Sequence, residues 1–203
     1  MKQDKKRLMS LDYNFFEPEN EMLPAKGKVL ISEPFLQDNY FKRSIILLTE
    51  HSEEGSVGFV LNKPVNLNAN EVINDFPKTD ALISIGGPVN TNTLHYIHTL
   101  GDIIPGSVKV LDTIYWGGDF EIVKRLIESG NLSKEQIRFF LGYSGWHKHQ
   151  LEDELADNAW VVTDLSPQEI MAPISKHFWK ATLKRMGKKY EMWSNFPENP
   201  QMN

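Results

Sequence analysis

Two strand-sized apolar runs separated by a short polar turn constrain the fold of this chain more than any other feature. The first run lies within residues 43–51 (RSIILLTEH), and the second is VGFVLN, which ends at Asn62. The five residues between them, SEEGS, are typical of a turn, and Pro64 closes the unit because proline cannot donate to a strand ladder. We therefore expect a β-hairpin over residues 43–62, and hence an antiparallel sheet.

Other segments predict a mixture of strands and helices. Further strands are expected at residues 27–33, 81–85, 93–100, 107–115 and 160–165, and one that begins at Ile137 and ends in a glycine-bracketed turn. Helices are expected at residues 69–76, 119–130, 149–158 and 166–186, the last interrupted at Pro173, and an extended tail at residues 191–203. This order favours an α+β fold with a mixed sheet over regular βαβ alternation.

Two helix starts carry specific capping signals. Asp119 suits the N-cap of a helix that ends before Gly130, and its apolar residues share one face. Ser166, followed by proline and then by Glu169, is a capping box with proline at the first helical position. The charged, aperiodic residues 1–24 predict a flexible N-terminal arm, and residues 25–203 contain no linker, so we expect them to form a single domain.

Composition excludes several classes of function. The 203 residues contain no cysteine, which excludes disulfides and thiolate chemistry, and the histidines are not spaced as a convincing ligand set, so no metal and no cofactor is expected. Acidic residues outnumber basic ones by 27 to 22, a net charge of -5 that makes direct nucleic-acid binding unlikely. With neither a leader-like apolar segment nor a membrane-length run, we expect a cytoplasmic protein that does not insert into a membrane.

Several motifs have both a functional and a structural interpretation. The bend at Gly86-Gly87 could present N–H groups to an anion, or it could be a tight turn. His51 next to a carboxylate could be a general base or could solvate a loop, and Asn62 could contact a ligand or satisfy a neighbouring turn. Ser144 lies in GYSGW, which lacks the glycine spacing of a nucleophile elbow.

Taken in order, several stretches resemble the YqgE/AlgH family from Gly27 to the end of the chain. They are GKVLISEPFLQDNYFKRSIILLTEH, GSVGFVLNKP, GGPV, Leu94-His95, GYSGW with QLEDEL after it, Trp160 and FPENPQMN. The resemblance implies a compact α+β fold whose branched sheet includes a small barrel-like element flanked by helices. Family members are mostly uncharacterised or labelled transcriptional regulators, a label that no recognition motif in this sequence supports.

The family pattern falls on eighteen positions of this chain: Arg43, Glu50, His51, Gly55, Gly58, Asn62, Pro64, Gly86, Gly87, Pro88, His95, Gly142, Tyr143, Gly145, Trp146, Gln150, Leu151 and Glu154. The sequence departs from it at Ser144 and His149, where members commonly carry alanine and glycine. These departures weaken a nucleophilic role for Ser144 and a family-wide role for His149.

Two hypotheses of function follow. The first is a regulatory module that binds an unknown small molecule or protein through residues of the hairpin, the glycine bend and the GYSGW segment: Arg43, His51, Asn62, Gly86, Gly87, Tyr143, Trp146, Gln150 and Glu154. The alternative is a hydrolytic or acid–base enzyme with a cleft lined by His51, Glu154 and the Gly86-Gly87 turn. The sequence favours the first, because it contains no ordered nucleophile, base and orienting group. It does not indicate an oligomeric state.

Overall fold

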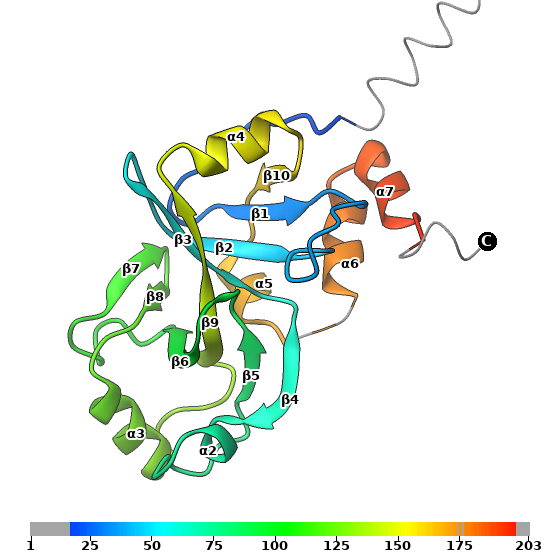
Figure 1. The fold of residues 1–203 in the computed structure, drawn as a ribbon. Coiled ribbons are helices and arrows are strands. Elements are labelled where there is room, and N and C mark those ends of the chain that lie inside the picture. The colour runs from blue at the N-terminus through cyan, green and yellow to red at the C-terminus, as the bar shows by residue number, and fades with distance from the viewer. Residues whose placement is uncertain (1–16, 174, 176, 198–203) are drawn as a thin grey trace, which may run out of the picture.

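The computed structural model describes residues 17–173, 175 and 177–197, and within them the chain forms ten strands and six helices (Figure 1). The strands are β1 (Val29–Ser32), β2 (Ile45–Ser52), β3 (Gly55–Val60), β4 (Pro64–Asn68), β5 (Leu82–Ile85), β6 (Val89–His98), β7 (Val108–Leu111), β8 (Ile114–Trp116), β9 (Ile137–His147) and β10 (Trp160–Thr163). The helices are α2 (Ala69–Val72), α3 (Phe120–Glu128), α4 (Gln150–Ala156), α5 (Pro167–Met171), α6 (Phe178–Arg185) and α7 (Lys188–Ser194).

All ten strands belong to one branched sheet. Its main path runs β10-β1-β2-β3-β9-β6-β8-β7, and β4 joins through β5, which pairs with β9. The β5–β9 pairing is parallel and the other pairings are antiparallel, so the expected mixed, branched sheet in a single α+β domain is confirmed. The main path begins at β10 and ends at β7 without pairing those two strands, so the described sheet does not close into a barrel.

Strand β9 is shared by both halves of the molecule. Its C-terminal part pairs with β3, from Ser144 to His147, and its N-terminal part pairs with β5 and β6. In Figure 1 it runs from the start of α4 down to the half that contains α2 and α3. The upper and lower halves are therefore joined by continuous backbone hydrogen bonding.

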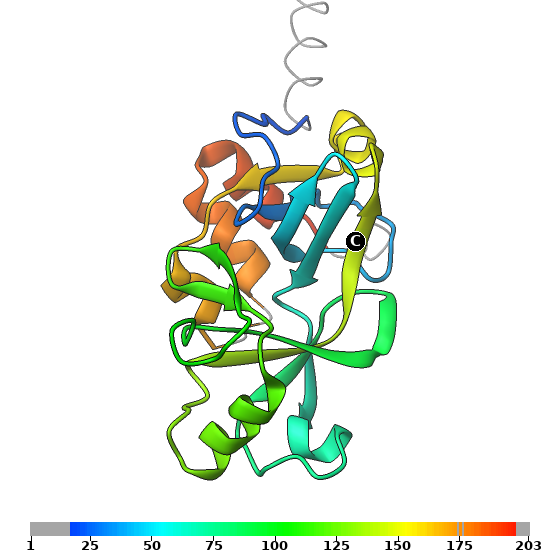
Figure 2. The same ribbon diagram turned by 90° about the vertical axis from the view of Figure 1, so that its left-hand side faces the viewer.

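The upper half buries both faces of its strands, because successive side chains of a strand point to opposite faces. Val29 and its same-face neighbours pack against Trp179 and Trp193 of the C-terminal helices. Leu30 faces the other way, into a cluster with Trp146 and Trp160 that α4 covers. Figure 2 shows α6 and α7 together on one side of these strands. In the lower half, α2 and α3 cover a separate apolar cluster centred on Phe139 of β9.

Local signals in the sequence predicted several elements correctly. Residues 45–60 form the expected hairpin, with β2 and β3 antiparallel. The Asp119 carboxylate accepts hydrogen bonds from the backbone N–H groups of Glu121 (2.9 Å) and Ile122 (3.2 Å), as an N-cap should. The capping box between Ser166 and Glu169 is present in both directions.

Four expectations need correction. Residues 107–115 form a tight hairpin of two strands, β7 and β8, rather than one strand. β9 does not end at the GYSGW glycines but continues to His147, because β6 and β3 pair with its successive parts, and Gly142 takes a positive φ of 65° within it. The tail contains helix α7, and the helix expected at residues 69–76 ends at Val72; residues 198–203 lie outside the described part.

The described part of the expected arm is attached to the domain. The Asn20 side chain donates to the Trp160 carbonyl (3.0 Å) and accepts from the Val162 N–H (2.8 Å), so it extends the edge of β10. The Glu19 N–H donates to the Tyr190 hydroxyl at 3.0 Å. Residues 1–16 lie outside the described residues.

Candidate functional site

The nine residues expected to line a site fall into three groups of contacts plus one residue at a hairpin end. The groups are Arg43 with Asn62, then Gly86 and Gly87 with Tyr143, then Trp146 with Gln150 and Glu154. His51 is the remaining residue.

In the first group, the Asn62 amide satisfies the backbone at the start of β2. Its oxygen accepts from the Ile45 N–H (2.9 Å), and its nitrogen donates to the Arg43 carbonyl (2.8 Å). This holds Arg43 at a positive φ of 52°, with its guanidinium carbon 4.9 Å from the centre of the Trp179 ring and Nη2 donating to the Phe196 carbonyl at 2.6 Å. A pocket of about 340 Å³ adjoins the group. The structural interpretation of Asn62 accounts for both ends of its amide.

In the second group, the two glycines allow the bend to touch β9. A Cβ on Gly86 would lie 2.2 Å from the Gly142 carbonyl oxygen, and one on Gly87 would lie 2.3 Å from the Tyr143 backbone. The Gly86 N–H donates to the Leu141 carbonyl (2.8 Å), so it is not available to an anion. The buried Ser144 hydroxyl donates to the Gly86 carbonyl (3.0 Å). Close backbone approach is thus the physical requirement for these glycines.

In the third group, Glu154 connects the end of β9 to β10. Its Oε2 accepts from the indole N–H groups of Trp146 (2.8 Å) and Trp160 (2.7 Å), and its Oε1 accepts from the Gln150 amide (3.0 Å). The Gln150 oxygen in turn accepts from the His147 N–H (3.0 Å). Both carboxylate oxygens are thus engaged by protein donors, which favours a structural role for Glu154.

His51 lies near the end of the β2–β3 hairpin. Its Nδ1 is 2.8 Å from the Ser56 hydroxyl, and Ser56 is the β3 residue that pairs with Trp146. His51 thus lies on the side of the hairpin that leads to the third group. Its described hydrogen bond is with Ser56.

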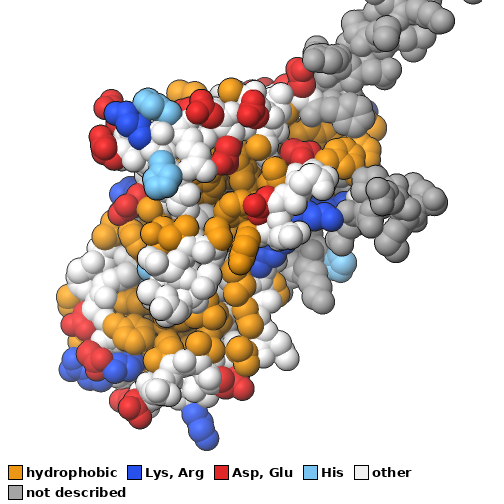
Figure 3. All heavy atoms as spheres, viewed as in Figure 1, with side chains coloured by type: hydrophobic (Ala, Val, Ile, Leu, Met, Phe, Trp, Pro, Cys, Tyr) orange, Lys and Arg blue, Asp and Glu red, His pale blue; other side chains and the backbone are white. Residues whose placement is uncertain are grey.

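A larger pocket opens next to the second group, where β6 extends past the end of β8. We call it the His95 pocket. Its volume is about 470 Å³, and its lining comes from α2, β6, the β8–α3 connection and β9: Val72, Ile73, Asn92, Leu94, His95, Tyr96, Trp116, Gly117, Gly118, Phe120 and Leu141. Figure 3 shows apolar side chains reaching the surface in the lower part of the molecule, where these elements lie. The His95 ring packs edge-on against Tyr143, with ring centres 5.7 Å apart, and so links the pocket to the second group.

Burial favours the neutral forms of the titratable groups of this pocket. Burial lowers the pKa of His95, whose Nε2 lies 3.0 Å from the Thr93 hydroxyl. Burial, with a smaller contribution from the Asp119 carboxylate, raises the pKa of Tyr96 to about 12. The Tyr96 hydroxyl donates to the Gly118 carbonyl at 2.7 Å. The pocket therefore offers a ligand apolar surface and neutral hydrogen-bonding groups.

His98 is a buried residue that contacts Gly117, one of the residues lining the His95 pocket. It is completely buried; its Nε2 lies 2.9 Å from the Gly117 carbonyl, and its Nδ1 accepts from the Leu100 N–H at 3.1 Å. Accepting at Nδ1 requires the neutral ring with its proton on Nε2. Burial accordingly lowers the pKa of His98, although the hydrogen bond to Gly117 opposes this in part.

Our sequence reasoning did not single out Arg138. A detectable signal exists, since it is the one charged residue in the run IRFFLG.

Among the described residues, no group of three His, Asp or Glu side chains is arranged to hold a metal ion. None of the helices in the described part combines the length and apolar character needed to cross a bilayer.

The chain is similar in sequence to known proteins along nearly its whole length. The chain is 44% identical over 197 residues to a UPF0301 protein of Bacteroides thetaiotaomicron. The matched region covers 96% of this chain and 100% of that relative. It is 40% identical over 185 residues to a UPF0301 protein of Chlorobaculum parvum, covering 91% and 98%.

Two solved structures have the same fold. A crystal structure of a protein from Corynebacterium diphtheriae matches with a TM-score of 0.71 at 25% identity, covering 88% of this chain and 95% of that one. The solution structure of AlgH from Pseudomonas aeruginosa matches with a TM-score of 0.68 at 27% identity, covering 88% and 98%. The AlgH-like family itself matches residues 29–191. The chain therefore belongs to the AlgH-like family.

Proposed function

We propose that this protein is a cytosolic regulatory module that binds a small, largely apolar ligand in the His95 pocket. The pocket itself is the observation that carries the proposal. At about 470 Å³ it lies within the range of roughly 300–1,000 Å³ common for small-molecule sites, and three aromatic side chains line it.

The polar groups of the pocket support a neutral ligand. His95 and Tyr96 have pKa values shifted toward their uncharged forms, and the described lining contains no lysine, arginine or carboxylate. A flat ring would stack on Trp116 or Phe120 and exchange hydrogen bonds with the His95 imidazole. Direct DNA binding is not part of the proposal, because a chain with a net charge of -5 lacks the positive charge that phosphate contacts require.

A thermal-shift screen of neutral aromatic and heteroaromatic compounds at pH 7.5 tests the proposal. A ligand present at about 100 times its Kd stabilises the native state by about 2.7 kcal/mol, which corresponds to a rise in Tm of about 5–10 °C for a protein of this size.

Two matched variants locate the binding. Val72→Trp places a large ring at the exposed rim of the pocket, whereas Leu67→Trp adds the same ring at an equally exposed residue outside it. We expect Val72→Trp to abolish the shift and Leu67→Trp to keep it. The proposal would be refuted if no compound raised the Tm, or if both variants bound the ligands equally. Binding of a protein partner to this face instead would also contradict it.

A further inference from the structure

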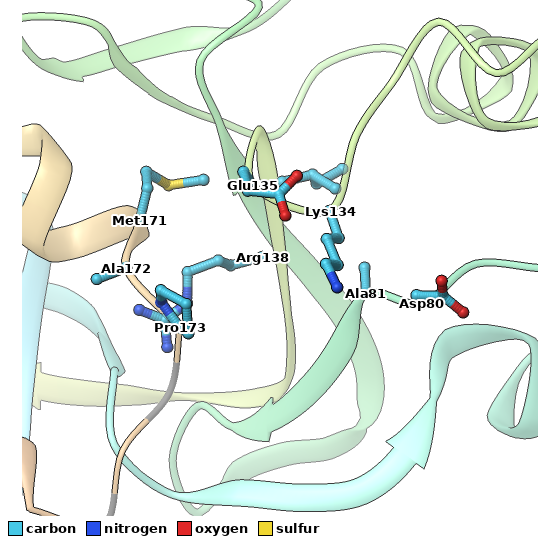
Figure 4. A pocket seen from close by; sticks show the side chains of 9 residues that line it. Asp80, Ala81, Lys134, Glu135, Arg138, Met171, Ala172 and Pro173 are labelled. Atoms are coloured by element: carbon cyan, nitrogen blue, oxygen red, sulfur yellow. The ribbon is translucent and has the colours of Figure 1, made fainter.

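A second pocket, which we call the Arg138 pocket, surrounds a buried guanidinium group (Figure 4). Its volume is about 220 Å³. It is lined by the residues before β5, the loop before β9, the start of β9, and the end of α5 with the residues after it: Asp80, Ala81, Lys134, Glu135, Ile137, Arg138, Met171, Ala172 and Pro173. Arg138 and Leu141, which lines the His95 pocket, are three residues apart on β9, so their side chains point to opposite faces. The two pockets are separate sites.

Arg138 is a buried cation without an anionic partner among the described residues. Its side chain is buried, with 6% of the residue exposed, and its Nε has no hydrogen-bond partner. Nη1 and Nη2 each donate to a backbone carbonyl, of Ile170 and Leu61 respectively, both at 2.5 Å. Burial lowers its pKa to about 10, so the group is still charged at neutral pH. Buried charges in proteins are normally paired, and this one is neutralised by no described side chain.

The surroundings supply a second cation and an apolar wall. Figure 4 shows the Lys134 ammonium beside Ala81, across the pocket from the Arg138 guanidinium, while the Asp80 carboxylate points away. Glu135 also lines the pocket and is exposed to solvent. Ala81, Ile137 and the segment Met171–Pro173 provide apolar surface on the remaining sides.

We propose that the Arg138 pocket binds a small organic carboxylate, with its charged group at the Arg138 guanidinium and its apolar body against Ala81, Ile137 and Met171. The guanidinium keeps N–H bonds beyond the two it donates to carbonyls, and guanidinium groups match carboxylates in geometry. A cavity of about 150 Å³ can hold benzene, so the volume here admits a ring or short chain bearing one carboxylate. This inference does not depend on the His95 pocket.

Benzoate is a suitable probe, with benzamide as its neutral counterpart and inorganic phosphate as an anion without an apolar body. Titrations of the full chain, followed by calorimetry and by backbone NMR shifts, should show benzoate binding at least ten times more tightly than either, with shifts around Ala81 and Met171. Equal binding of benzamide would refute the role of the charge. Equal binding of phosphate would refute the role of the apolar wall.

The variants must leave the fold intact. Replacing Arg138 would not do so, because the backbone carbonyls of Leu61 and Ile170 would lose their hydrogen-bond donor. Two variants therefore test the pocket. Lys134→Gln removes its exposed cation, and Lys109→Gln on β7 is the matched exposed control. Ala172→Phe fills the pocket, and Ala156→Phe at an exposed position is its control.

Lys134→Gln should weaken benzoate binding about twofold, because it removes a positive charge from the same pocket without removing a contact to the carboxylate. Ala172→Phe should abolish binding, while both controls bind as the parent does. Unchanged binding in both pocket variants would overturn the proposal. Val72→Trp should leave benzoate binding intact, which separates failure of this site from failure of the His95 pocket.

Discussion

Trp146 and Trp160 donate their indole N–H groups to the same atom, Oε2 of Glu154, at 2.8 and 2.7 Å. The two rings meet edge to face, with centres 6.1 Å apart. One carboxylate thus fixes the relative position of β9 and β10, whose indole rings form much of the apolar cluster beneath α4.

Glu154→Gln should destabilise the protein by about 2 kcal/mol, because hydrogen bonds to a charged acceptor contribute about 1.5–3 kcal/mol and the new amide N–H₂ would face the donating Gln150 amide. Urea denaturation followed by circular dichroism measures this as a lower midpoint. Glu152→Gln, at an exposed position of the same helix, is the control and should unfold as the parent does. Equal midpoints for the two variants would contradict the structural role of Glu154.

Stability should decrease as the pH falls below about 6.5. The pKa of His98 is lowered in the native state from its usual 6.5, so the unfolded chain takes up the proton first as the pH falls. The neutral ring therefore contributes fully to the free energy of unfolding above pH 6.5, and this contribution is lost as the pH falls toward the native pKa. His95 shifts in the same direction and adds to the effect.

Urea denaturation between pH 8 and pH 5 tests this dependence. His98→Gln can keep a donor toward the Gly117 carbonyl and an acceptor for the Leu100 N–H, so it should fold and show a shallower decrease. If His98→Gln lost as much stability as the parent between pH 8 and pH 5, the neutral state of His98 would not be the cause of the decrease.

His149→Gly should stabilise the protein by about 0.5–1 kcal/mol. His149 precedes α4 with a positive φ of 65°, which costs an L-residue about 1–2 kcal/mol, whereas glycine adopts it freely at a smaller cost in the unfolded state. His149→Ala retains a Cβ and should gain nothing. Thermal unfolding of the three proteins should place only the glycine variant above the parent; a gain in the alanine variant would point to the imidazole as the cause instead.

Gly86→Ala should destabilise the protein by at least about 2 kcal/mol, because the new methyl group would lie 2.2 Å from the Gly142 carbonyl oxygen and force the bend away from β9. Gly130→Ala is the informative comparison. Gly130 has a positive φ of 69°, and apart from its own chain neighbours no atom lies within 4 Å of the position that a methyl group would take there, so its cost should be about 1 kcal/mol of backbone strain. Similar losses at the two positions would mean that close approach is not what Gly86 provides.

The elements that could be predicted from sequence are those whose cause is local. The hairpin over residues 43–62 follows from two apolar runs and a polar turn, and the start of α3 follows from the side chain of Asp119. β9 was predicted too short because glycines at 142 and 145 are typical of turns. In the structure, β3 and β6 bind its two edges and hold it extended through them.

The grouping of the candidate residues depends on long-range pairing, which periodicity does not reveal. The sequence suggested that Asn62 satisfies a nearby turn, and its two hydrogen bonds agree. That Glu154 would meet two indoles, or that His95 would face a hollow beside Trp116, follows only from the order of strands in the sheet. Arg138 could have been noticed as a charge within an apolar strand, but its lack of a described counter-ion could not.

The sharing of β9 between the two halves has a consequence for how the molecule comes apart. We expect neither half to unfold while the other stays folded, because unfolding either half breaks backbone hydrogen bonds of β9. Amide protons at Phe139 and Phe140 should therefore exchange with solvent only when the entire chain opens, at a rate that reports global rather than regional unfolding.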